Sequence, residues 1–198
     1  SSDLAAAMTA WPTSGGLANP RDVRGLEILA AIFNDRLFDR LRAEQGASYG
    51  PVVDSHWPTG FDGSGGYLLV GSLLAPKDIG RFYGIAKDIA ADLVANPVGA
   101  DELGRNAVPI REQVARASTG NVYWMFLLEG ATRDPRVTAA ALTIEEDISS
   151  VTPADIQRLA RTYLEPSRQW SLAILPKGMT LADAAALDKA ATAAAGGR

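Results

Sequence analysis

The segment Arg36–Gly50 reads RLFDRLRAEQGASYG, and it decides the fold because it joins the end of a helix to the start of a strand. Its first half has the apolar spacing of a helix and carries three arginines. Gly46 is the expected left-handed residue that ends this helix, since glycine adopts a positive φ without steric cost. The chain is therefore expected to reverse within about one helical turn. We expect Arg42 and Tyr49 to lie close together at this reversal.

Arg42 and Tyr49 have two interpretations that the residues alone leave open. A cation in the last turn of a helix is favoured by the helix dipole, and tyrosine is a common strand residue. Both residues therefore fit a purely structural role. Alternatively, the guanidinium and the phenol point into one cleft, where they would hold a peptide carbonyl or the oxyanion that it becomes.

Outward from this segment, the hydrophobic pattern predicts elements in the order β-α-β-β-α-α-α-α-β. The helix that ends at Gly46 begins near Pro20, and apolar residues on several of its sides indicate a largely buried helix. Thr152 begins a Thr-Pro-Ala-Asp sequence that matches a helix capping box. The expected strands cover about residues 4–11, 47–57, 67–74 and 169–175, and the other expected helices about 76–96, 100–117, 121–131 and 152–165.

These elements predict an α+β domain with an antiparallel-rich mixed sheet and helices packed on one face. The reason is that the helices are clustered along the chain instead of alternating with strands. The domain is expected to span residues 1–177. Residues 178–198 are rich in alanine and are interpreted as a C-terminal tail.

The composition excludes several classes of function. The 198 residues carry a net charge of −4, which argues against a nucleic-acid binder with its concentrated basic face. The sequence contains no Cys, so disulfides, thiolate metal sites and cysteine nucleophiles are excluded. No apolar run approaches the roughly 18 residues of a membrane span. We therefore expect neither nucleic acid nor a membrane span.

The single histidine, His56, argues against a metal site in this chain. A zinc hydrolase needs three protein ligands, usually including two histidines, and the inverted zinc motif H-x-x-E-H is absent. We expect His56 to be a structural or surface residue. The acidic run Glu145–Asp147 is interpreted as a helix start and the glycine-rich segment Gly60–Gly66 as a hairpin loop. The helix around Trp124 is interpreted as core packing, with an exposed partner site as the alternative.

The arginine and tyrosine belong to a longer pattern. Arg36-Leu37, Leu41-Arg42, Gln45-Gly46 and Tyr49 match the sequence R-L-x-x-x-L-R-x-x-Q-G-x-x-Y. This segment resembles the second half of the insulinase/pitrilysin zinc peptidases, also called inverzincins. The order of elements and the late helix opened by Thr152 fit the same family, so the resemblance covers residues 1 to about 177.

The resemblance implies a clamshell enzyme in which a homologous N-terminal half or subunit holds the zinc ion. This chain would then be the half without metal and would form one wall of the substrate chamber. Tyr49 would stabilise the oxyanion, and Arg42 and Tyr49 together would bind the substrate, a peptide or an unfolded protein. The expected cofactor is zinc in the partner half and none in this chain.

A second reading belongs to a different class of function. The chain would be a catalytically inactive homologue that serves as a peptide-binding or assembly subunit. The presence of both Arg42 and Tyr49 favours the peptidase half, because a pure scaffold does not need that pair. The high alanine content suggests a bacterial source, and the sequence leaves the compartment open between periplasm and cytoplasm.

The isolated chain is predicted neither to bind zinc tightly nor to hydrolyse peptides, because it has one His, no Cys and no paired-His helix motif. Metal analysis of the dialysed protein, combined with a fluorogenic peptide assay, checks this prediction. Stoichiometric zinc together with turnover that a chelator abolishes would contradict it.

Overall fold

In a computed structural model of the chain, the described residues are 3–14, 16–45, 50–57 and 65–185. No helix within these ranges is long and apolar enough to cross a membrane. The elements follow in the order β1 (Ala5–Pro12), α1 (Pro20–Gln45), β2 (Val52–His56), β3 (Tyr67–Leu74), α2 (Ile79–Ala95), α3 (Ala100–Ala117), α4 (Asn121–Leu127), α5 (Pro135–Leu142), α6 (Ile144–Ser150), α7 (Pro153–Tyr163) and β4 (Trp170–Ile174).

The four strands form one sheet in the order β2-β3-β1-β4. All three pairings among the described strands are antiparallel. The first and last strands of the chain lie side by side, and buried Thr9 helps to join them. Its hydroxyl donates to the carbonyl oxygen of Trp170 at 3.1 Å, and the Gln169 amide donates to that hydroxyl at 2.7 Å.

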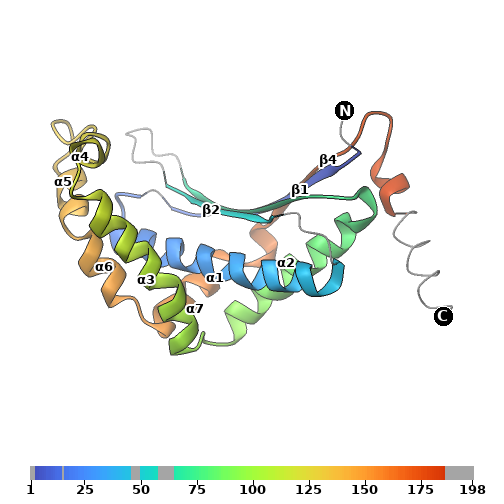
Figure 1. Cartoon of the computed structure of the whole chain (residues 1–198), viewed down its shortest axis with the longest axis horizontal. Coiled ribbons are helices and arrows are strands. Elements are labelled where there is room, and N and C mark those ends of the chain that lie inside the picture. Colours follow the sequence, from blue (N-terminus) through green and yellow to red (C-terminus); the bar gives the residue numbers. More distant parts are fainter. Residues whose placement is uncertain (1–2, 15, 46–49, 58–64, 186–198) are drawn as a thin grey trace.

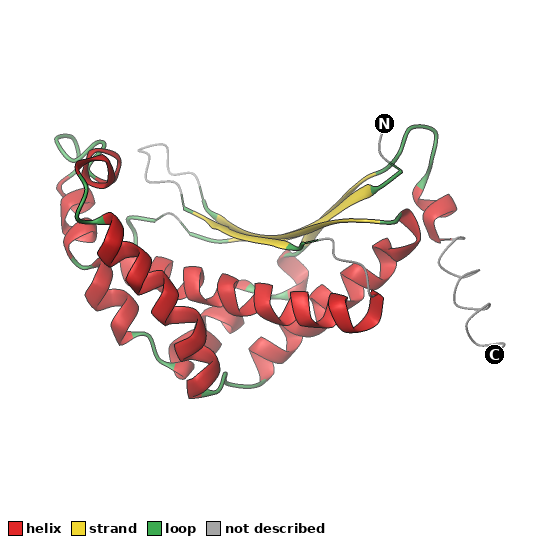
Figure 2. Cartoon of the chain, viewed as in Figure 1, coloured by secondary structure: helices red, strands yellow, loops and turns green. Residues whose placement is uncertain are grey.

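The helices pack against one face of the sheet, as Figures 1 and 2 show. The predicted α+β fold with helices on one face is therefore confirmed. Two short helices, α5 and α6, lie between α4 and α7 in the chain. The hydrophobic pattern did not predict them as separate elements. The acidic run Glu145–Asp147 lies in the first turn of α6, as predicted.

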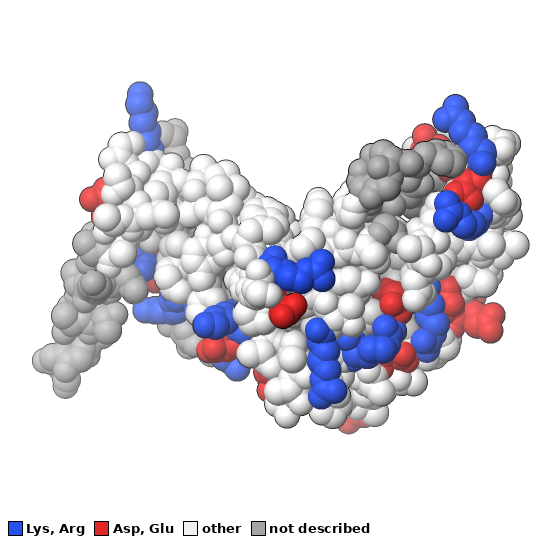
Figure 3. Space-filling view, turned by 180° about the vertical axis from the view of Figure 1, so that it is seen from behind, with Lys and Arg blue, Asp and Glu red and all other residues white. Residues whose placement is uncertain are grey.

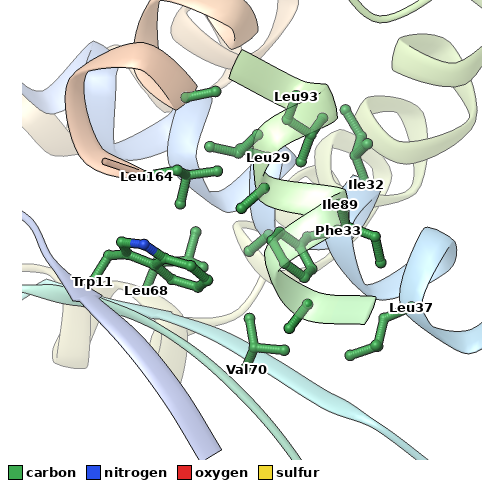
Figure 4. Close-up of a cluster of buried hydrophobic side chains, with 14 of the residues drawn as sticks. Trp11, Leu29, Ile32, Phe33, Leu37, Leu68, Val70, Ile89, Leu93 and Leu164 are labelled. Carbon is green, nitrogen blue, oxygen red and sulfur yellow. The ribbon is translucent and has the colours of Figure 1, made fainter. Parts of the chain in front are cut away.

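The core lies between the sheet and α1 (Figure 4). Trp11 from β1 and Phe33 from α1 are both fully buried, with ring centroids 6.0 Å apart. Leu68 and Val70 from β3 reach the same cluster. Alternate residues of the central strands therefore point toward the helices, as the twofold side-chain period of a strand requires.

Helix α1 is buried on much of its circumference because it lies between the sheet and the outer helices. It contacts α2, α3, α6 and α7 as well as β2 and β3. Gly25 permits the close approach of α7, since a Cβ atom at this position would collide with the side chain of Leu159. The several apolar sides of the helix thus correspond to several packing partners.

The capping box predicted at Thr152 is formed at the start of α7. The Thr152 hydroxyl accepts from the Asp155 backbone N–H, and the Asp155 carboxylate accepts from the Thr152 backbone N–H. Thr143, before α6, does not form the equivalent backbone bond. Its hydroxyl donates instead to the carboxylate of Asp147 at 2.8 Å.

Helix α4 differs from the predicted core packing around Trp124, because only Tyr123 and Leu127 pack against the core, and they do so in part. None of its residues is buried, and Val122, Met125 and Phe126 are between 63% and 67% exposed. The helix lies at one end of the molecule, away from the central sheet (Figure 1). An apolar composition on all sides identifies no buried face, so the sequence pattern could not place this helix.

The first part of the alanine-rich C-terminal segment contacts the domain. Thr180 and Asp183 exchange hydrogen bonds at the start of a short helical stretch, and Ala184 is buried. Ala184 lies beside Pro76 and Ile79 at the start of α2. Residues 186–198 lie outside the described ranges, so the division at residue 177 stays a prediction.

Substituting Phe33→Ala is expected to lower the free energy of unfolding by about 3–5 kcal/mol, because the change removes a buried ring and leaves a cavity. Urea unfolding followed by circular dichroism measures the loss. The matched control is Phe126→Ala, where the ring is 67% exposed and the expected change is within about 0.5 kcal/mol. Equal losses in the two variants would refute this account of the core.

Candidate functional site

Arg42 lies in the last turn of α1, as the sequence predicts. Its side chain is exposed and forms no ion pair or hydrogen bond with the described residues. No described side chain therefore uses the donors of the Arg42 guanidinium. A cation in this position is also favoured by the helix dipole, so both interpretations of the residue are compatible with its place.

Tyr49 and the expected helix stop Gly46 lie outside the described residues. The predicted cleft shared by Arg42 and Tyr49 therefore stays a prediction. The described chain resumes at Gly50, directly before β2, and α1 packs against β2. The two ends of the reversal, α1 and β2, are thus neighbours in space.

Arg36, the first residue of the motif, has a structural role. Its Nε and Nη2 atoms donate to the two carboxylate oxygens of Glu102 in α3, at 2.7 and 2.8 Å. Its Nη1 atom donates to Asp92 in α2 at 2.6 Å. The hydrogen bond from Arg36 lowers the pKa of the Glu102 carboxyl below its ordinary value. One guanidinium thus joins three helices.

His56 is exposed on β2, and its ring stacks on that of Tyr67 in β3 with centroids 5.0 Å apart. This cross-strand contact fits the expected structural or surface role.

Among the described residues, no group of three or more His, Asp or Glu side chains could hold a metal ion. The predicted hairpin between β2 and β3 is confirmed by their antiparallel pairing, although most of the glycine-rich loop lies outside the described ranges.

Two concavities that the sequence did not reveal lie between α1 and β2. A cavity of about 270 Å³ lies under Trp57 and is bounded by α1, α4 and α5. A shallow groove of about 450 Å³ continues along β2. Glu27 and Ser55 line both. An Arg and a Glu three residues apart are a common helix-surface pair, so only tertiary packing distinguishes Glu27.

Burial raises the pKa of the Glu27 carboxyl, while the neighbouring Arg24 guanidinium lowers it. Arg24 donates to the Oε1 atom of Glu27 at 2.8 Å. The Oε2 atom accepts no hydrogen bond from the described residues. The pair therefore leaves one carboxylate oxygen for another group at the junction of the cavity and the groove.

The face of the sheet that points away from the helices carries large exposed apolar side chains. These side chains are between 46% and 60% exposed, and they are Val52, Leu73, Trp170, Leu172 and Ile174. The surface is hollowed on the side of this face, and charged side chains gather mainly over the helical layer (Figure 3). Such an apolar concave surface is typical of a place where another chain binds.

No family model and no curated protein matches the sequence. Solved structures do match the fold. The inactive peptidase domain of a candidate zinc protease from Bordetella parapertussis aligns with a TM-score of 0.74 at 18% identity, covering 89% of this chain and 92% of that one. A candidate zinc protease from Bordetella pertussis Tohama I aligns with a TM-score of 0.72 at 19% identity, covering 87% and 94%.

A candidate M16-like peptidase from Alicyclobacillus acidocaldarius aligns with a TM-score of 0.70 at 15% identity. The alignment covers 87% of this chain and 41% of that chain, so the present chain spans less than half of the larger protein. The structure thus has the fold of an M16-like peptidase domain, the fold that the resemblance to the insulinase/pitrilysin peptidases implies.

Glu102→Gln is expected to destabilise the protein at neutral pH and to have a smaller effect in acid. The Glu102 pKa is lowered from 4.5 in the folded state, so its ionised form stabilises the fold above that value. This stabilisation is lost as the pH falls through the folded-state pKa. Thermal melts of both proteins between pH 3 and 7 measure the difference. A difference that stayed constant over this range would mean that the Arg36 bond contributes no pH-dependent stability.

Proposed function

We propose that this chain is the half without metal of a zinc endopeptidase and that it forms one wall of the substrate chamber. The observation that carries the proposal is the match to a solved inactive peptidase domain along nearly the whole of both chains. The motif that ends with Arg42 and Tyr49, together with the absence of H-x-x-E-H, supports the same assignment. The partner would be a homologous half or subunit that binds zinc through that motif.

In the complete enzyme, the zinc ion of the partner half would activate the water that attacks the peptide carbonyl. Tyr49 would donate a hydrogen bond to the oxyanion as negative charge develops on the carbonyl oxygen. A donor that interacts more strongly with the transition state than with the substrate raises turnover. The exposed guanidinium of Arg42 would donate to a neighbouring substrate carbonyl and orient the phenol.

The division of roles within the motif supports this proposal. Arg36 donates hydrogen bonds to Glu102 and Asp92 and so joins helices of the domain. Arg42 has no such partner among the described residues and is free to bind a substrate. The alternative, an inactive peptide-binding or assembly subunit, differs in one respect: Arg42 and Tyr49 would then have no influence on hydrolysis.

Tyr49→Phe is expected to lower kcat by about 10²–10³-fold with little change in KM, because it removes one oxyanion donor. Arg42→Ala is expected to raise KM as well, since a carbonyl contact is lost in the ground state and in the transition state. Steady-state kinetics of the enzyme reconstituted from both halves measures these effects.

Arg40→Ala is the matched control for Arg42→Ala, because Arg40 is also exposed near the end of α1 and is not part of the motif. Thermal melts establish that each variant is folded. If Tyr49→Phe keeps the original turnover in a folded enzyme, the pair is structural: Arg42 is a helix-end charge and Tyr49 an ordinary strand residue.

A further inference from the structure

The cavity under Trp57 has the composition of a site for a small ligand. It encloses about 270 Å³ between the start of α1, the end of β2, and helices α4 and α5. Apolar side chains from α1, α4 and α5 form most of its wall, whereas its charged and hydroxyl groups belong to Arg24, Glu27 and Ser55. Concave sites with apolar walls and a few polar groups are typical of ligand binding.

The charged part of the wall is an ion pair with unused hydrogen-bonding capacity. Arg24 donates to the Oε1 atom of Glu27 at 2.8 Å, and the two side chains are 16% and 32% exposed. The Oε2 atom of Glu27 accepts no hydrogen bond from the described residues. The Nε atom of Arg24 is buried and has no acceptor among the described residues. The pair therefore offers an acceptor on Glu27 and lacks an acceptor for Arg24.

Ser55 adds a donor from the β2 side of the cavity. Its Oγ atom accepts from the indole N–H of Trp57 at 2.7 Å, and its own hydroxyl hydrogen has no acceptor among the described residues. Ser55 and Glu27 line both the cavity and the groove along β2, so the hydroxyl and the carboxylate lie at the same junction. A ligand at this junction can donate to Glu27 and accept from Ser55.

The charge balance of the wall favours a neutral head group on the ligand. Arg24 and Glu27 neutralise each other, so the pair offers no net charge. Glu27 would repel a carboxylate and Arg24 would repel an ammonium group, and an unpaired charge is costly to bury. A primary carboxamide is uncharged and carries an N–H donor and a carbonyl acceptor on the same carbon. It therefore complements the Glu27 acceptor and the Ser55 donor together.

We propose that the cavity under Trp57 binds a small neutral molecule that has a primary carboxamide head and an apolar tail. The amide N–H donates to the Oε2 atom of Glu27, and the amide carbonyl accepts from the Ser55 hydroxyl. The tail packs in the cavity against Val23 and Val137. Burial of the tail supplies most of the affinity, and the two hydrogen bonds of the head group supply the specificity.

This site is separate from the Arg42–Tyr49 pair. Glu27 and Arg42 lie 15 residues apart on α1, which corresponds to about 22 Å along the helix axis. The inference does not rest on the proposed peptidase role. Ligand binding in the cavity and turnover of the reconstituted enzyme are therefore measured and judged independently.

The probes are hexanamide, hexylamine and sodium hexanoate, which share one tail and differ in the head group. Each is titrated into the ¹⁵N-labelled chain, and the indole N–H signals are followed by NMR, with Trp57→Phe assigning the signal of Trp57. Hexanamide is expected to move this signal with a dissociation constant of about 1 mM, while the signals of Trp11 and Trp170 stay in place. The charged probes are expected to bind at least about tenfold more weakly.

Two variants and one control test the place and the head group. Ala140→Phe puts a ring into the cavity and should abolish hexanamide binding. Ala139→Phe is the matched control, because Ala139 is the preceding residue on α5 and is exposed outside the cavity wall. Glu27→Gln leaves Arg24 as an unpaired cation, so the preference should switch from hexanamide to hexanoate by about tenfold. Thermal melts establish that each variant is folded.

The proposal is overturned if about 10 mM hexanamide, ten times the expected dissociation constant, leaves the Trp57 signal in place. It is also overturned if either charged probe binds the original protein as tightly as hexanamide. This comparison needs no variant, so it decides even if Ala140→Phe does not fold. A folded Ala140→Phe variant that binds hexanamide as well as Ala139→Phe would refute the place, and an unchanged preference in Glu27→Gln would refute the role of Glu27.

Discussion

The burial of α1 between the sheet and the outer helices is the constraint on which the rest of the structure depends. Its 26 residues span about 39 Å at 1.5 Å per residue. The helix contacts strands β1, β2 and β3 and four of the described helices. A helix packed on so many sides cannot rotate or slide without opening the core, because protein interiors are packed as densely as organic crystals. Its two ends are therefore fixed relative to the sheet.

Two arginines on this rigid helix have different surroundings. Arg36 points at α2 and α3 and uses its donors to hold them, with bonds of 2.6 to 2.8 Å. Arg42 lies six residues farther along the same helix and remains exposed. A bidentate guanidinium–carboxylate pair is specific in direction as well as strong. The motif therefore contains Arg36, which holds α1 against its neighbouring helices, and Arg42, which α1 exposes at the surface.

The sheet has two faces and a free edge, and each has a different character. Its helical face forms the core, its other face is apolar and exposed, and its β2 edge is not paired with another described strand. A domain with these features is suited to contact an extended chain through backbone groups and a neighbouring domain through the apolar face. This combination of surfaces supports the proposal that the chain forms one wall of a substrate chamber.

The sequence by itself determined the elements whose signals are local. The apolar spacing from Pro20 onward located α1, and the Thr152–Asp155 pair located the start of α7. Alternating residues located β4, and short apolar segments bounded by turn residues located β1 and β3. These signals depend on helical and strand periods and on capping chemistry within a few residues, so no distant contact is needed to recognise them. The placement of Arg42 in the last turn of α1 followed for the same reason.

Only the tertiary structure decided which apolar residues are buried and which polar residues act together. Trp170, Leu172 and Ile174 alternate as regularly as core residues, yet they lie on the uncovered face because no described helix packs there. The Trp124 helix is apolar, yet none of its residues is fully buried, because the helix lies at one end of the molecule. Arg36 and Glu102 are 66 residues apart, and Glu27 meets the β2 groove across the α1–β2 contact. These relations depend on how helices and strands pack together, which the period of a single segment does not encode.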